Sequence, residues 1–229
     1  MKKILIAIVG AFAALPLLAA QDDAAFKPQN ITVGEFFSNP VGYSLEDLSF
    51  SWQLPLLRQG IMQTAYQVVV ADTPQNLEKN PVWDTGKVDS AQSVNVQYGG
   101  PALQSRQRLY WQVRVWDENG EASAWSDVNF FEAGLLSNAE WSGKWISSSE
   151  PMTAKAAFRK ITDTSTVSQE GVPPTYLRKE FKVKSGVAKA RLYVASRGIF
   201  QFYLNGKKVG NDYWGTGWTD FSKRIQANT

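Results

Sequence analysis

The sequence predicts an all-β protein built from two successive β-sandwiches, and three observations support this class. Apolar and polar residues alternate in short runs, which is the pattern of strands with one buried face. Turn-forming residues separate these runs, and no run repeats with the 3.6-residue period of an amphipathic helix. The chain also contains 9 Trp, 8 Tyr and 12 Phe, a load that suits both sandwich cores and sugar-binding surfaces.

The first predicted sandwich covers residues 26–133. Its strongest strand is 109–116, where apolar residues on one face alternate with mixed residues on the other. The buried face is expected to hold Trp111, Val113 and Val115, and the opposite face Tyr110, Gln112, Arg114 and Trp116. Asp-Glu-Asn-Gly at 117–120 predicts a hairpin, and 124–126 is expected to open the returning strand. Weaker strands are expected at 48–54, 66–70, 82–86 and 94–98.

The chain changes character after residue 133. We predict a linker at 134–151 and the start of a second, jelly-roll-type sandwich at 152–229, with a long surface loop at 153–174. In the second sandwich, Asn205-Gly206 is a favoured two-residue hairpin turn. Strands are expected at 176–183, 190–194, 200–204 and 207–210. Three or four strands cannot close a jelly roll of about eight, so we expect the second sandwich to be incomplete in this chain.

Residues 1–20 have the features of a secretory signal peptide. Lys2 and Lys3 form a positive start, residues 4–18 an apolar stretch, and Ala19-Ala20 a small-residue cleavage site. Polar residues follow without a basic stop-transfer cluster, and no Cys for a lipoprotein anchor follows the apolar stretch. We therefore expect an exported protein, periplasmic or extracellular, that begins at Gln21 and has no membrane contact after cleavage.

The composition excludes several classes of function. The 24 basic residues less Lys2 and Lys3 leave 22, against 21 acidic residues, so the mature chain has no basic excess for binding nucleic acid. With 0 Cys and 0 His, the chain has no thiol nucleophile, no imidazole base and no disulfide framework. Any chemistry would have to come from Asp, Glu, Tyr, Lys or Arg.

The first predicted sandwich resembles a fibronectin type III or immunoglobulin-like module. In fibronectin type III modules an aromatic-x-Val-x-Val strand is followed by Asn-Gly or Asp-Gly and then by Trp-Ser, as at 111–115, 119–120 and 125–126 here. Trp111 stands where that family usually has Tyr, which puts the family's corner hydrogen bond in question, because an indole can donate but not accept. Arg114 and Trp125 are expected to stack as a cation–π pair.

Over nearly the whole mature chain, the order and spacing of the motifs resemble the N-terminal half of bacterial α-L-rhamnosidases of glycoside hydrolase family 78. The motifs that carry this resemblance lie at 82–88, 110–117, 192–194, 204–210 and 217–220. The resemblance implies hydrolysis of terminal α-L-rhamnose from plant glycosides or polysaccharides by an inverting pair of carboxylates on a helical barrel further along the chain. It therefore implies no catalytic residue in this chain, a rhamnose-containing glycan as partner, and packing against that barrel.

A carbohydrate-binding site is expected in residues 211–221. Gly215 and Gly217 are expected to leave neighbouring indole faces uncrowded, and polar side chains there can bind sugar hydroxyls. The candidate residues are Asn211, Asp212, Trp214, Trp218 and Asp220. The structural alternative is a Trp-rich plug that packs on the barrel. Asp212 and Asp220 come nearest to a carboxylate pair, and we expect them to cap turns, contact sugar or bind metal rather than catalyse.

No cofactor is required by these patterns. Calcium is an alternative at the second sandwich, since some related second domains bind rhamnose through it and hard cations take carboxylate and amide oxygens. Two other functions remain open on the residues alone. One is an exported carbohydrate-binding or adhesion β-sandwich protein without enzyme activity, and the other is a general fibronectin-type interaction module.

Overall fold

The computed structural model describes residues 26–44, 48–55, 60–147, 175–213, 215, 217 and 219–229. The chain divides into two compact units, Met1–Leu136 and Ser137–Thr229. The predicted signal peptide at 1–20 and the predicted loop at 153–174 lie outside the described residues. No helix within the described residues has the length and apolar character needed to cross a membrane.

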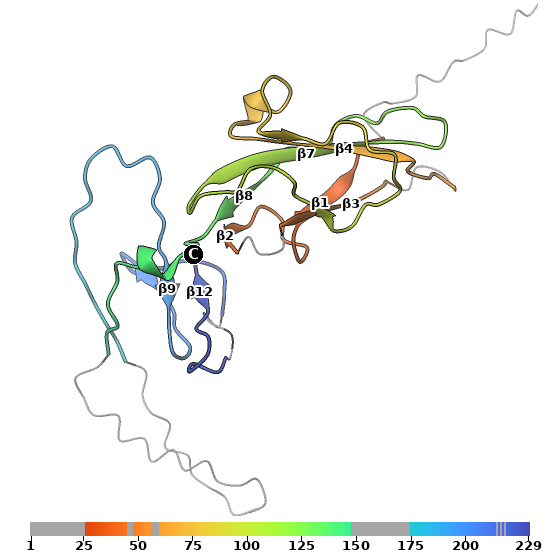
Figure 1. Ribbon diagram of the computed structural model, residues 1–229. Helices are drawn as coiled ribbons and strands as arrows, with labels where there is room; N and C mark the ends of the chain where they lie inside the picture. The colour runs from red at the N-terminus through yellow and green to blue at the C-terminus, as the bar shows by residue number, and fades with distance from the viewer. Residues whose placement is uncertain are drawn as a thin grey trace, which may run out of the picture. The chain divides into compact units, whose positions relative to one another are not determined.

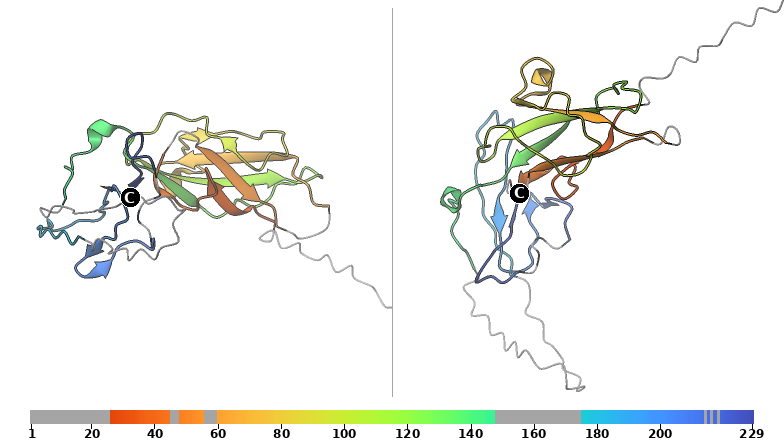
Figure 2. Two further views of the ribbon diagram at one scale, coloured as in Figure 1. Left: turned by 90° about the horizontal axis from the view of Figure 1, so that it is seen from below. Right: turned by 45° about the vertical axis from the view of Figure 1, so that its right-hand side comes forward.

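The first unit is a β-sandwich of a three-stranded and a five-stranded sheet (Figure 1). The smaller sheet has the order β1 (Gln29–Val33), β3 (Ser49–Gln53), β6 (Val96–Gln97). The larger has the order β2 (Val41–Tyr43), β8 (Asn129–Ala133), β7 (Arg108–Trp116), β4 (Ala65–Ala71), β5 (Trp83–Asp84). All neighbours pair antiparallel except β2 and β8, which are parallel. Figure 2 shows the two layers from other directions, and they confirm the all-β class.

Strand β7 confirms the predicted inward set of residues, although Gln112 on the opposite face is also buried, at 5% exposed. Trp111, Val113 and Val115 are all 0% exposed and belong to one core cluster, whereas Arg114 and Trp116 are only partly buried. Phe50 and Trp52 of β3 face the same core. Successive residues of a strand point to opposite faces, so Trp111, Val113 and Val115 all face the core if any one of them does. Within the described residues the Trp111 Nε1 group finds no acceptor.

The expected returning strand at 124–126 is not a strand. The hydroxyl of Ser123 accepts a hydrogen bond from Val115 N at 3.0 Å, and that of Ser126 accepts one from Val113 N at 3.1 Å. These serine oxygens take the place of backbone carbonyls beside β7, so a regular ladder does not form until β8 begins at Asn129. The expected pair of Arg114 and Trp125 is confirmed, with the guanidinium 4.7 Å from the ring centroid.

The second unit contains two small antiparallel pairs of strands. One pairs β9 (Val194–Ala195) with β12 (Ala227–Asn228), and the other joins β10 (Tyr203–Leu204) to β11 (Lys207–Lys208). Asn205 and Gly206 have φ angles of 50° and 77°, the two left-handed conformations that a type I′ turn requires. The predicted hairpin is therefore confirmed. A 3₁₀ turn, η2 (Asn138–Glu140), begins the unit and is closed by a capping box from Ser137.

The strand expected at 176–183 is absent. These residues have no strand conformation, and Tyr176, Phe181 and Val183 are 91%, 62% and 67% exposed. Alternation favours a strand only when a neighbouring strand completes its hydrogen bonds, and no described segment pairs with this one. The strand predicted at 190–194 is likewise reduced to a pair that starts at Val194.

Phe36 is a strained residue, because its φ of 66° lies in the left-handed region while its side chain is 68% exposed. Its turn is closed by hydrogen bonds in both directions between Val33 and Phe37, at 2.8 and 3.0 Å. The left-handed conformation costs a non-glycine residue about 1–2 kcal/mol. An exposed ring recovers little of this cost through burial.

Phe36→Gly is therefore expected to raise the free energy of unfolding of the first unit by up to about 1 kcal/mol, after the larger unfolded-state entropy of glycine is deducted. Phe36→Ala removes the ring but keeps the strain, and it should leave stability nearly unchanged. Urea unfolding of the three chains measures both effects. A loss of stability in both variants would show that the ring itself stabilises the fold.

Candidate carbohydrate-binding site

The predicted binding segment is only partly described. Trp214 and Trp218 lie outside the described residues, so their part of the prediction stays a prediction. Asn211, Asp212 and Asp220 are exposed to solvent. The side chains of Asn211 and Asp212 make no hydrogen bond or ion pair within the described residues. Their polar groups are therefore available to an outside ligand.

Asp220 is held within its own turn. Its Oδ1 accepts hydrogen bonds from Ser222 N at 3.0 Å and from the Ser222 hydroxyl at 2.6 Å, while Lys223 Nζ lies 3.8 Å from Oδ2. The hydrogen bonds from the Ser222 hydroxyl and backbone favour the charged carboxylate and lower the pKa of Asp220 below its ordinary value. The carboxylate caps a turn, and its Oδ2 lies beside a lysine.

Tyr213 is a member of this segment that the sequence analysis missed. Its ring is 79% exposed, and Lys208 Nζ lies 4.8 Å from the ring centroid. The same ammonium donates to the carbonyl oxygen of Asp212 at 2.6 Å. The signal was present in the sequence, since Tyr213 lies between a candidate Asp and a candidate Trp. Its aromatic face can stack on a sugar as an indole can.

The two glycines of the segment pack closely against other residues, while their expected effect on the indole faces of Trp214 and Trp218 stays a prediction because both tryptophans lie outside the described residues. A Cβ on Gly215 would lie 2.6 Å from the carbonyl oxygen of Phe200, and one on Gly217 would lie 2.7 Å from Gln226 Oε1. Gln226 Oε1 accepts a hydrogen bond from Gly217 N at 3.0 Å, and the Asn228 amide donates to Gly215 O. The glycines thus permit close packing of the segment against Phe200 and the C-terminal residues.

No metal centre is formed by the residues that the structure describes, because no group of three or more Asp or Glu side chains converges there. The chain has no His or Cys to substitute for them. Asp220 is surrounded by Ser222 and Lys223 rather than by further carboxylates. The calcium alternative stays a prediction for the segment as a whole.

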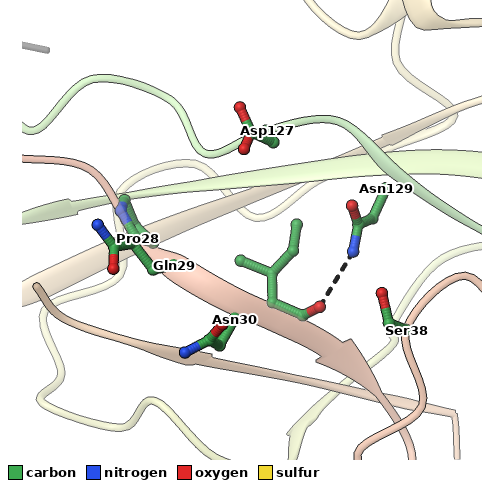
Figure 3. Close-up of a pocket in the computed structure, with 7 residues that line it drawn as sticks. Pro28, Gln29, Asn30, Ser38, Asp127 and Asn129 are labelled. Carbon is green, nitrogen blue, oxygen red and sulfur yellow. Dashed lines mark hydrogen bonds between the residues drawn. The ribbon is translucent and has the colours of Figure 1, made fainter.

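A separate pocket lies on the first unit, with a volume of about 130 Å³ (Figure 3). It opens between β1, at the edge of the small sheet, and the chain that leads into β8. Its lining residues are Pro28, Gln29, Asn30, Ile31, Ser38, Asp127 and Asn129. Sequence reasoning missed this pocket, and no local pattern could have shown it, since Asn129 and Ile31 are 98 positions apart.

The fold and these candidate sites define a chain with an immunoglobulin-like β-sandwich followed by a second β unit that carries exposed polar and aromatic groups. Comparison with known protein families identifies the two units more closely. Residues 28–137 match the "Rha78A-like, N-terminal immunoglobulin domain" and residues 185–229 match the "Alpha-L-rhamnosidase N-terminal domain". The chain belongs to the N-terminal region of the α-L-rhamnosidase family, as its resemblance predicted.

Curated relatives agree with this assignment. The chain is 40% identical over 204 residues to an α-L-rhamnosidase of Formosa agariphila, a match that covers 88% of this chain and 21% of the relative. It is 40% identical over 206 residues to an α-L-rhamnosidase of Alteromonas sp. (strain LOR), covering 89% and 21%. This chain therefore spans about a fifth of the length of the curated relatives it matches.

Solved structures are similar as well. The α-L-rhamnosidase structure from Dictyoglumus thermophilum matches with a TM-score of 0.69 and 33% identity, covering 87% of this chain and 23% of that one. The Streptomyces avermitilis enzyme, solved in complex with L-rhamnose, matches with a TM-score of 0.51 and 42% identity, covering 54% and 12%. The first of these similarities extends over both units of the chain.

Proposed function

We propose that this chain is the exported, non-catalytic N-terminal part of an α-L-rhamnosidase that removes terminal α-L-rhamnose from plant glycosides or polysaccharides. One observation carries the proposal: both units match, in order, two N-terminal domains of that family. The relatives that share this order are α-L-rhamnosidases about five times as long as the matched region. The remainder of such an enzyme has ample length for a catalytic domain.

The catalytic carboxylates are proposed to lie outside these 229 residues. An inverting glycosidase needs an acid and a base about 6.5–9.5 Å apart, with a water between them. Two acidic residues of the first unit have structural partners: Arg108 binds Glu132 at 2.9 Å, and Asp117 Oδ1 accepts from Asn119 N and Glu121 N. These contacts support a scaffold role.

In this proposal the second unit contacts the rhamnose-containing glycan. The candidate residues are Asn211, Asp212, Tyr213, Trp214, Trp218 and Asp220. Asn211 and Asp212 support the proposal because their side chains are exposed and available, and Tyr213 because its ring is exposed. Aromatic faces bind the apolar side of a pyranose, and amide and carboxylate groups bind its hydroxyls.

The purified chain is expected to release no nitrophenol from an aryl α-L-rhamnoside, whereas the longer protein from the same gene should do so. Equal molar amounts of both are assayed with the same substrate. An Asp212→Asn chain is the control for chemistry at the nearest candidate carboxylate. Turnover by the short chain that disappears in this variant would overturn the non-catalytic role. Inactivity of the longer protein would favour the rival function, a binding or adhesion protein.

Export is tested separately. When residues 1–229 are expressed in a bacterium with a periplasm, the protein is expected outside the cytoplasm with Gln21 at its N-terminus, because an apolar stretch ends at small residues there. Mass spectrometry of the intact protein measures the start. Ala20→Arg should block cleavage and retain the leader. A cytoplasmic product that still carries residues 1–20 in the unmodified chain would contradict export.

A further inference from the structure

We propose that the pocket on the first unit binds one pyranose ring of a neutral glycan. This site is distinct from the segment at 211–221 and does not depend on the proposed rhamnosidase activity. It lies between β1, an edge strand of the smaller sheet, and the chain entering β8 of the larger sheet (Figure 3). Three features support it: a polar rim with unused hydrogen-bonding groups, a balanced charge and a fixed backbone.

The pocket is small and mainly polar. Pro28 and Ile31 are buried, so their side chains expose little surface to it, whereas Gln29, Ser38 and Asp127 are exposed at the rim. The volume is about 130 Å³. A sugar ring that enters it therefore meets mainly amide, hydroxyl and carboxylate groups and leaves the rest of a glycan in solvent.

The polar rim has hydrogen-bonding capacity that the fold does not use. Asn129 Nδ2 donates to Ile31 O at 3.0 Å, and Asn30 Nδ2 donates to Gln53 Oε1 at 2.9 Å, which leaves both amide oxygens as acceptors. The side chains of Gln29 and Ser38 make no hydrogen bond within the described residues. Sugar hydroxyls both donate and accept, so they match this mixture of amide and hydroxyl groups.

The charge of the pocket favours a neutral ligand over an ion. Asp127 is the acidic residue of the lining, and its Oδ1 lies 2.8 Å from Lys27 Nζ. The two charges compensate one another at the mouth of the pocket. A cation would be repelled by Lys27 and an anion by Asp127. The hydroxyls of an uncharged sugar can accept a hydrogen bond from the lysine and donate one to the carboxylate.

The binding groups are positioned before a ligand arrives. Asn30 has a φ of 47° in the irregular stretch of β1 where the register with β3 shifts. Asn129 is tied to Ile31, and Asn39 Oδ1 accepts from Phe130 N at 2.8 Å, which holds the segment that carries Ser38. Fixed side chains lose less conformational entropy on binding. In this proposal the irregular stretch of β1 positions Asn30 for ligand binding as well as pairing with β3.

The test uses the complete mature chain, labelled with ¹⁵N and titrated with L-rhamnose, D-galactose and D-glucose. We expect at least one sugar to give saturable shifts of the Gln29, Asn30 and Asn129 amide signals, with a Kd in the range of about 1 mM. Gln29→Ala combined with Ser38→Ala should weaken that Kd about tenfold, because the sugar loses two hydrogen bonds. Neither side chain has a partner in the described part of the fold, so the double variant should melt like the parent chain.

Two controls separate binding at this pocket from binding elsewhere on the chain. Gln104→Ala changes an exposed glutamine away from the pocket and should leave the Kd unchanged. Trp214→Ala with Trp218→Ala removes two of the three aromatic groups of the second candidate site and should leave the shifts at Asn129 intact. Absence of saturable shifts at these amides with all three sugars would overturn the proposal, as would an unchanged Kd in the folded double variant. Neither result would bear on rhamnoside hydrolysis by the longer protein.

Discussion

Trp111→Ala is expected to lower the free energy of unfolding of the first unit by about 3–5 kcal/mol, the usual cost of truncating a buried aromatic. Trp111 is 0% exposed, and its ring centroid lies 4.5 Å from that of Phe50 on the facing sheet. Removal of the indole therefore leaves a cavity between both sheets. Since small domains are stable by about 5–15 kcal/mol, the first unit should be close to unfolded.

Trp116→Ala is the matched control on the same strand. Trp116 lies on the outer face, is partly exposed, and contacts Lys87 and Arg114 at 5.1 and 5.0 Å from its ring centroid. Exposed cation–π pairs contribute about 0.5–1 kcal/mol, so this loss should be much smaller. Urea unfolding followed by the methyl NMR signals of Val68 and Val113 reports on the first unit alone. A larger loss in Trp116→Ala would reverse the assignment of inner and outer faces.

Trp111→Phe should fall between these two variants. The Trp111 Nε1 group is buried and has no acceptor within the described residues, and an unsatisfied buried donor costs about 1–3 kcal/mol. Phenylalanine removes that donor while it keeps most of the ring. If Trp111→Phe is as damaging as Trp111→Ala, shape rather than the indole N–H decides the energy at this position.

Arg108→Met is expected to cost about 3–5 kcal/mol, because it removes the positive charge from a buried ion pair. The Glu132 side chain is only 1% exposed, and Arg108 Nε donates to its Oε2 at 2.9 Å. Arg108 also lies over the Phe130 ring, 3.9 Å from the centroid. Methionine retains most of the apolar part of the arginine side chain. The loss in the free energy of unfolding should therefore come mainly from the missing charge and less from lost packing.

An exposed ion pair of nearly equal length provides the control. Lys27 and Asp127 are 2.8 Å apart, but their side chains are 33% and 85% exposed, and such pairs contribute about 0–1 kcal/mol. Lys27→Met should therefore have little effect. The double variant Arg108→Met, Glu132→Leu should recover much of the stability lost in Arg108→Met, since a pair of apolar side chains replaces the buried charges. A loss that persists in the double variant would assign the effect to packing on Phe130.

The strands of the first unit were predictable where buried and outward-facing residues alternate with the two-residue period of a strand. Residues 109–116 have strict alternation, and burial of Trp111 with Val113 and Val115 follows from it. The turn at Asn205-Gly206 was equally predictable, because two consecutive residues in the left-handed conformation favour Asn-Gly or a similar pair of residues. These features depend on residues that are adjacent in the chain. Trp214 and Trp218 remain sequence-based candidates.

The predictions that were wrong, and the pocket that was missed, depend on contacts with residues that are distant in the chain. Residues 176–183 alternate as a strand does, yet no described segment pairs with them, and residues 124–126 meet β7 through the hydroxyls of Ser123 and Ser126. The pocket joins residues 28–31 to Ser38 and to residues 127–129.

The all-β class, the family and the inward-facing residues of the longest strand follow from the amino-acid sequence alone. The physical reason is that side-chain direction in a strand and conformation in a tight turn are local properties of the backbone. The three-dimensional structure was needed to show which alternating segments pair with another strand, which glycines allow close packing and where polar side chains surround a pocket. Those outcomes depend on hydrogen bonds and contacts between segments up to about a hundred positions apart, as between Lys27 and Asp127, and no local pattern contains them.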